Sequence, residues 1–200
     1  MKKSFEKTIK IFKENNGILR TGQAKKLGIH QPVLVQMHDE GVLIKETRGL
    51  YRLSEKPPLS FPDFVQVSMR VPNAVICLIS ALSFHQLTTQ IPYQIYIALP
   101  QKTKAPRFIY PPLDIVYLSE KTYEPGIVEH ILDGEKVKIY GREKTIADCF
   151  KFRNKIGLDI AIEALKDYFR QPEPDLEDLI KYAIINRVMN IIEPYIQALI

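Results

Sequence analysis

The sequence has 200 residues, of which 46% are hydrophobic and 26% are charged. This hydrophobic content excludes a disordered chain. The length suffices for one large domain, or for a small module followed by a larger one. The N-terminal lysines alternate with apolar residues, unlike a signal peptide, and no segment has the length and apolarity of a membrane span. Cys77 and Cys149 lie within apolar patterns, as reduced core cysteines do. We therefore expect a cytoplasmic protein without a membrane partner.

The net charge of +5 is concentrated in the first quarter of the chain. Residues 1–56 hold twelve Lys and Arg against six Asp and Glu, whereas residues 57–200 hold sixteen against seventeen. A local basic surplus is typical of a module that binds a polyanion, because long-range attraction steers the partner and released counterions add to the affinity. Charge that serves only solubility explains the surplus equally well.

Residues 1–56 are predicted to form three helices and a β-hairpin. The first helix is amphipathic, with Phe5 and Phe12 on one face, and ends at Asn15-Asn16-Gly17 before the short extended piece GILRT. The second helix covers residues 22–27, and Gly28 provides the turn that follows it.

The third helix is predicted to begin near Pro32 and to end at about Glu40, because proline is favoured in the first helical turn and Gly41 follows. After it, VLIKETRGLYRLS is typical of two strands around a tight turn at Arg48-Gly49. Three helices followed by a hairpin predict a winged helix-turn-helix.

The outward face of the third helix is the predicted DNA-reading surface. Leu34 and Met37 share the inner side, while Gln31, Val35 and Asp39 share the opposite one. Glutamine pairs with adenine in the major groove, so Gln31 and Gln36 are candidate base readers. Basic side chains would contact phosphates and fix the register. With His30 added, the predicted DNA-binding residues are Lys25, Lys26, His30, Gln31, Gln36, Lys45 and Arg48. Helix pairs of this kind also occur in protein–protein modules.

A proline-rich segment separates this module from the rest of the chain. Pro57-Pro58 and Pro62 predict a semi-rigid linker over residues 57–62. The fold class predicted for the whole chain is α+β, with residues 63–200 forming the larger domain. Its mixed part spans 63–140 and its helical part spans 141–200.

Local patterns predict the elements of this larger domain. Residues 73–87 have the apolar density of a buried helix, and the strands are expected in QIYIALP, DIVYL and VKIY. On the later helices, Lys144, Asp148, Lys151 and Lys155 are expected on the outer sides.

No recognisable catalytic pattern occurs in the larger domain. Its acidic residues are scattered, and His85 near the end of an apolar helix is typical of a satisfied, partly buried histidine. The sequence contains no phosphate-binding glycine loop, no Gly-x-Ser-x-Gly elbow and no Cys-x-x-Cys pair. We therefore predict a protein that is not an enzyme and holds neither metal nor cofactor, although a site assembled from distant residues would escape this test.

Three stretches of the sequence resemble a known family. LGI before the third helix, together with RGLYRLS at 48–54, looks like the N-terminal DNA-binding domain of the AbiEi family. ISALSFHQLTTQIPYQIYIALP at 79–100 is similar to the start of that family's larger domain, and REKTIADCFKFRNKIGLDIAIEALKDYF at 142–169 resembles its C-terminal helices. The family provides the antitoxin and autorepressor of type IV toxin–antitoxin systems.

The resemblance implies a specific set of partners. The chain would bind the double-stranded DNA operator upstream of its own operon and counter a nucleotidyltransferase-like toxin, without requiring a stable complex with it. Family members tend to carry arginines on the third helix, where this sequence has Gln31, Gln36, Asp39 and Glu40, which implies a different base preference.

Two other functions remain open from the sequence. One is a ligand-responsive transcriptional repressor whose larger domain is a sensor, which would need a sizeable apolar pocket with a few convergent polar groups. The other is an enzyme that modifies a toxin or nucleic acid and uses the first domain for targeting.

Overall fold

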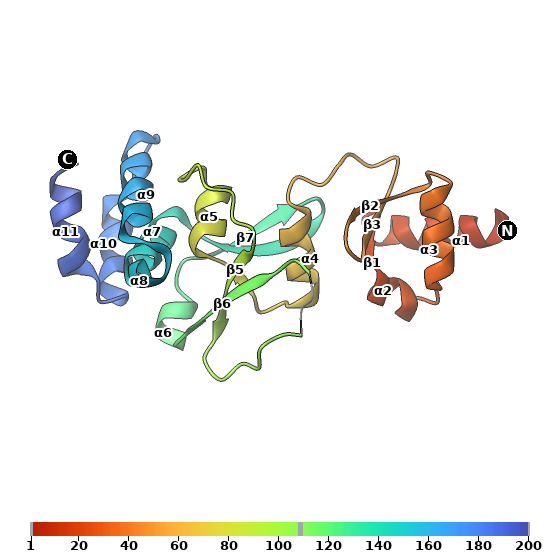
Figure 1. The fold of residues 1–200 in the computed structure, drawn as a ribbon, viewed down its shortest axis with the longest axis horizontal. Helices are drawn as coiled ribbons and strands as arrows, with labels where there is room; N and C mark the ends of the chain where they lie inside the picture. The colour runs from red at the N-terminus through yellow and green to blue at the C-terminus, as the bar shows by residue number, and fades with distance from the viewer. Residues whose placement is uncertain (1, 108–109, 200) are drawn as a thin grey trace. The chain divides into compact units, whose positions relative to one another are not determined.

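The chain forms two compact units in the computed structural model, which describes residues 2–107 and 110–199. Unit 1 extends to Arg70 and includes the segment Ile131–Lys136, and unit 2 consists of Val71–His130 and the chain from Val137 onward. Helices and strands occur in both units, so the predicted α+β class is confirmed (Figure 1). Unit 1 is larger than the module expected over residues 1–56.

Unit 1 contains an antiparallel three-stranded sheet in the order β1-β3-β2. Helices and strands lie where the periodicity of residues 1–56 places them. They are α1 (Lys2–Glu14), β1 (Ile18–Arg20), α2 (Thr21–Lys26), α3 (Gln31–Asp39), β2 (Leu43–Thr47) and β3 (Leu50–Leu53). Fully buried Phe12, Leu34 and Met37 form its core together with strand residues such as Leu19 and Leu43. The predicted inner faces of the first and third helices are therefore confirmed.

A further helix, α4 (Pro62–Arg70), completes unit 1 and was not predicted. Pro62 was assigned to the end of a linker, yet proline is also favoured in the first turn of a helix. Phe64, Val65 and Val67 on α4 are buried, and the helix packs against β2. Residues 62–70 are thus part of the folded unit.

Unit 2 is built on a five-stranded mixed sheet in the order β6-β5-β4-β8-β7. Strand β4 is antiparallel to β5 and parallel to β8, and β5 is parallel to β6. The strands are β4 (Val75–Ile76), β5 (Ile95–Pro100), β6 (Leu113–Leu118), β7 (Ile127–Leu132) and β8 (Glu135–Tyr140). The three predicted strands correspond to β5, β6 and β8.

The buried helix expected over residues 73–87 is shorter than predicted. Val75 and Ile76 form β4, pairing with Ala98 and Ile97 of β5, and the helix α5 spans only Leu78–Phe84. A short continuous apolar run fits a buried strand as well as a buried helix, so periodicity alone could not divide it.

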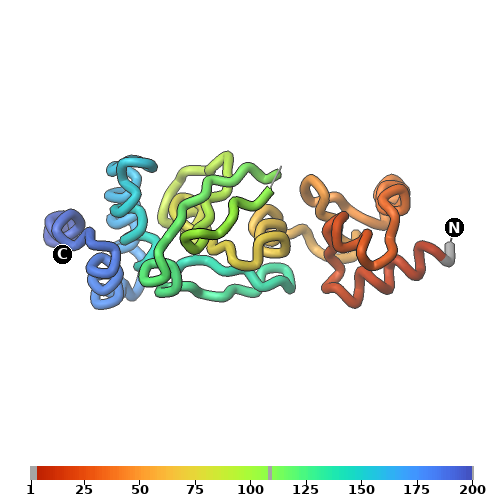
Figure 2. Tube along the Cα trace, turned by 90° about the horizontal axis from the view of Figure 1, so that it is seen from below, coloured from red at the N-terminus to blue at the C-terminus, as the bar shows by residue number. Residues whose placement is uncertain are grey.

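The C-terminal part of unit 2 is helical, as predicted, and Figure 2 shows its last helices (blue) gathered on one side of the strands of this unit. The helices of unit 2 after α5 are α6 (Glu120–Tyr123), α7 (Arg142–Lys151), α8 (Arg153–Ile156), α9 (Leu158–Arg170), α10 (Leu176–Ile185) and α11 (Met189–Gln197). Helix α7 packs against α5, α9 and α10. Among the described residues, no helix has the length and apolarity needed to cross a membrane.

Candidate nucleic-acid interface

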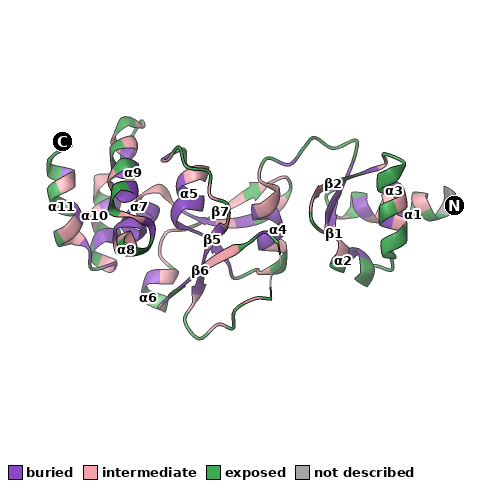
Figure 3. Ribbon diagram, viewed as in Figure 1, coloured by how far each residue is buried: buried purple, intermediate pink, exposed green. Residues whose placement is uncertain are grey.

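The outward face of α3 lies on the surface of unit 1 (Figure 3). The helix begins after His30, which has an extended backbone, and carries Pro32 in its first turn. Leu34 and Met37 are buried, whereas Val35 is 43% exposed. An open pocket of about 470 Å³ lies on this outer side, lined by Gln31, Pro32, Val35, Gln36 and Asp39.

The two predicted base readers differ in their surroundings. Gln31 is exposed, whereas Gln36 is half-buried and its Nε2 donates a hydrogen bond to Oε1 of Glu40 at 2.9 Å. A bidentate pair with adenine uses both the nitrogen and the oxygen of a glutamine amide. The surroundings of Gln31 thus suit the predicted role better, because Gln36 would have to exchange its bond to Glu40 for one to a base.

The other predicted DNA-binding residues, which are His30 and the four predicted phosphate contacts, are all exposed. Lys25 and Lys26 lie in the last turn of α2, His30 immediately precedes α3, Lys45 lies on β2, and Arg48 lies in the β2–β3 turn. Arg48 lines a different pocket from Gln31 and Gln36. The predicted residues thus belong to one unit, but the three of them that line these pockets are divided between two pockets.

The second pocket of unit 1, which we call the three-arginine cleft, was only partly predicted. It has a volume of about 370 Å³ and is lined by Arg20, Thr21, Gly22, Arg48, Gly49, Gln66 and Arg70. Burial, and secondarily the charge of Arg70, lower the pKa of the Arg20 guanidinium. Strand β1 brings Arg20 opposite Leu50 of β3, next to the turn that carries Arg48. Arg20 comes near Arg48 through the pairing of β1 with β3, which no local sequence pattern predicts.

Arg52 in the same unit has a structural role. It is only 4% exposed and forms an ion pair with Glu46. Its Nη1 also donates to the carbonyl oxygens of Leu53, at 3.1 Å, and of Lys56. A buried guanidinium requires such partners, and Arg52 receives them from its own chain.

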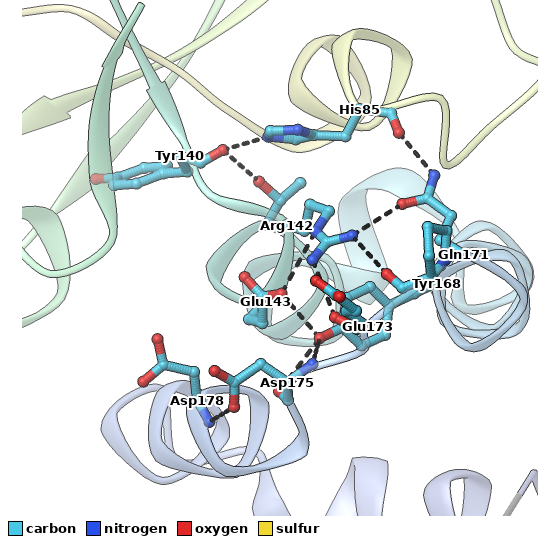
Figure 4. Close-up of polar contacts among 11 residues, drawn as sticks. His85, Tyr140, Arg142, Glu143, Tyr168, Gln171, Glu173, Asp175 and Asp178 are labelled. Atoms are coloured by element: carbon cyan, nitrogen blue, oxygen red, sulfur yellow. Dashed lines mark hydrogen bonds and ion pairs between the residues drawn. The ribbon is translucent and has the colours of Figure 1, made fainter.

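Unit 2 contains a polar network that joins α5, α7, α9 and α10 (Figure 4). The Arg142 guanidinium lies 3.5 Å from Oε1 of Glu143 and donates to Gln171 Oε1 and to the carbonyl oxygen of Glu173. Tyr168 Oη donates to the same Glu143 oxygen at 2.8 Å. These groups satisfy one another and hold helices together.

His85 belongs to this network through its backbone and its ring. Its Nε2 lies 2.7 Å from the carbonyl oxygen of Tyr140, and its own carbonyl oxygen accepts a hydrogen bond from Gln171. Burial lowers the pKa of His85, although the hydrogen bond to Tyr140 opposes this shift. The expectation of a satisfied, partly buried histidine is confirmed.

The expectation that Lys144 and Asp148 lie on an outer, solvated side is wrong. Their side chains are 0% and 1% exposed and form an ion pair with each other. Asn186 Nδ2 donates to Asp148 Oδ1 at 2.7 Å, and the Lys144 ammonium lies 4.3 Å from the centre of the Tyr140 ring. Since α7 packs against α5, α9 and α10 among other helices, the side that carries Lys144 and Asp148 is buried as well as its apolar side.

Comparison with known proteins shows a fold and no family. No known family profile and no curated protein matches the sequence. Among solved structures, the RV2827C protein from Mycobacterium tuberculosis is similar, with a TM-score of 0.54 over 88% of this chain and 69% of that chain. The two sequences are 12% identical, so the likeness concerns the fold alone.

Proposed function

We propose that the protein is a DNA-binding repressor in which unit 1 is a winged helix-turn-helix, with α3 as its recognition helix and the β2–β3 hairpin as its wing. The observation that carries this proposal is the exposed polar face of α3, with Gln31 at its start and Lys25 and Lys26 exposed on the preceding helix. A helix presented in this way enters the major groove with its N-terminal residues toward the bases, while lysines beside it contact phosphates. The basic surplus of residues 1–56 supports the same partner.

The finer proposal is an antitoxin and autorepressor of a type IV toxin–antitoxin system. Its support is the resemblance of three sequence stretches to the AbiEi family, two of which lie in unit 2. The protein would then protect cells that express a nucleotidyltransferase-like toxin encoded beside it. Co-expression with the neighbouring gene tests this role: growth arrest that the protein does not relieve would contradict it, while DNA binding would remain a separate result.

The DNA-binding proposal is tested by titrating DNA from upstream of the protein's own gene, and unrelated DNA, at two salt concentrations. Lys25→Ala/Lys26→Ala should weaken binding to both DNAs and reduce the salt slope by about two, one for each lost phosphate contact. Gln31→Ala should weaken binding to the operator by about 5- to 150-fold, corresponding to about 1–3 kcal/mol for a base contact, with little change on unrelated DNA.

Lys166→Ala is the matched control, because this lysine is exposed on α9 of unit 2. It should leave both affinities unchanged. If the wild-type protein binds the upstream DNA no more tightly than unrelated DNA, sequence-specific repression is wrong; if it binds neither, the proposal fails altogether.

A further inference from the structure

The three-arginine cleft gathers positive charge from three segments that are distant in the sequence. Arg20 ends β1, Arg48 lies in the β2–β3 turn, and Arg70 ends α4 (Figure 1). None of the described residues that line the cleft is acidic. Gln66 Nε2 donates to the carbonyl oxygen of Arg48 at 2.9 Å, so α4 helps to hold the turn in place.

The environment of Arg20 indicates that the cleft is built for an anion. Its Nε atom is buried and has no hydrogen-bond partner within the described chain. Arg70 is near enough for its charge to disfavour the protonated form of Arg20, yet an arginine keeps its charge at neutral pH. An anion that enters the cleft would reduce the repulsion between these two like charges.

Arg52 provides the internal comparison. It is more buried than Arg20, and the chain supplies it with a carboxylate and two carbonyl oxygens. No comparable set surrounds the Arg20 Nε in the part of the chain that the structure describes. The chain thus satisfies the guanidinium of Arg52 but, in its described part, not the Nε of Arg20.

We propose that the three-arginine cleft binds a phosphate group, with Arg20 as its central ligand and Arg48 and Arg70 beside it. The planar guanidinium offers paired N–H donors whose spacing matches two phosphate oxygens. A volume of about 370 Å³ leaves room for the group to which the phosphate is attached. The phosphate can belong to the DNA backbone or to a small phosphorylated molecule, and only the first source rests on the proposed function.

The binding step is tested on the full chain by NMR titration of the arginine Nε–H signals with inorganic phosphate and pyrophosphate. Chloride at matched ionic strength controls for general screening. We expect saturable shifts for phosphate and pyrophosphate but not for chloride, and at least a tenfold loss of affinity in Arg20→Gln. Arg170→Gln, which removes an exposed arginine paired with Asp167 in unit 2, should retain wild-type affinity. Absence of saturation, or equal affinity in Arg20→Gln and wild type, would overturn the proposal.

The source of the phosphate is distinguished by measuring DNA affinity of the same variants. Equal weakening of Arg20→Gln on operator and unrelated DNA, together with lost phosphate binding, assigns the cleft to the DNA backbone. Lost phosphate binding with unchanged DNA affinity assigns it to a small phosphorylated ligand. If wild-type protein binds phosphate saturably but no DNA, the proposed function fails while the cleft assignment stands. Unchanged circular dichroism and melting temperature confirm that Arg20→Gln is folded.

Discussion

Arg20 in unit 1 and Arg142 in unit 2 are both half-buried, but their surroundings are opposite. Arg142 lies beside the Glu143 carboxylate, donates to Gln171 and Glu173, and lies 5.5 Å from the centre of the Tyr168 ring. Arg20 shares its cleft with two other arginines and has a buried Nε without an acceptor in the described chain. A charge whose partners come from the chain organises the fold, whereas a charge that lacks them is available to a ligand.

The largest loss of stability is expected when a substitution removes the partner of a buried charge in unit 2. Asp148→Ala leaves the Lys144 ammonium buried without its carboxylate, which should lower the free energy of unfolding by about 3–5 kcal/mol. Urea titration followed by circular dichroism measures the loss. Glu14→Ala is the control, since its pair with Lys10 is exposed and should contribute less than about 1 kcal/mol.

A second variant checks that the loss comes from an uncompensated charge. Lys144→Met/Asp148→Leu removes both charges and should recover part of the stability, because replacing a buried pair by apolar residues is often neutral or favourable. A cost for Asp148→Ala no greater than that of Glu14→Ala would show that the pair does not organise unit 2.

A substitution at Gly126 tests how tightly Lys144 is packed. The φ of Gly126 is +80°, and an added Cβ would lie 2.6 Å from the Cβ of Lys144. Gly126→Ala should cost about 1–3 kcal/mol for overpacking, in addition to about 1–2 kcal/mol for a left-handed backbone. Gly28 has the same φ but no atom within 4 Å of an added Cβ, so Gly28→Ala should show the backbone cost alone. Equal losses in urea titrations of the two variants would contradict tight packing around Lys144.

Removal of the Tyr168 hydroxyl tests how much the hydrogen bonds around Arg142 and Glu143 stabilise unit 2. The hydroxyl donates to Glu143 Oε1 at 2.8 Å and accepts from the backbone N–H of Asp175 at 2.6 Å. Tyr168→Phe should therefore lower the free energy of unfolding by about 1–2 kcal/mol, since both groups lose a hydrogen bond. Tyr93→Phe, at a side chain that is 85% exposed, should change it by less than about 0.5 kcal/mol. Similar melting temperatures for the two variants would show that the network contributes little.

Local signals in the sequence were enough to predict the helices and the hairpin of residues 1–56, but not α4, which completes unit 1. Leu34 and Met37 at helical spacing, Pro32 at a helix start and Arg48-Gly49 between two apolar runs each depend on neighbours within a few residues. The positions of α1 to α3 and of the hairpin follow from such signals. The second arginine of the cleft lies 28 residues from the first and the third lies 22 residues further on, so only tertiary structure joins them.

The buried pair of unit 2 could not be predicted for a different reason. Lys144 and Asp148 are four residues apart, the spacing of a solvated ion pair on a helix surface. Their burial follows from the packing of α7 against α5, α9 and α10, which no pattern within residues 142–151 reports. Helical periodicity identifies an apolar face but does not show whether the polar face is covered too.

The smallest effect is expected for Arg20→Gln, and Arg142→Gln provides its comparison. Arg142→Gln removes a charged donor from Gln171 and Glu173 and should cost about 1.5–3 kcal/mol, of the size of a hydrogen bond from a charged group. Arg20→Gln should change the free energy of unfolding by less than about 0.5 kcal/mol. The Arg20 Nε donates no hydrogen bond that the substitution would break, and the loss of its charge removes the repulsion from Arg70. Urea titrations in phosphate-free buffer measure both. In buffer with saturating phosphate, the wild type and Arg142→Gln should gain stability and Arg20→Gln should not, since a ligand that binds only the folded state stabilises it. A loss for Arg20→Gln as large as that for Arg142→Gln, in the absence of phosphate, would mean that Arg20 serves the fold, and the contrast between the two units would disappear.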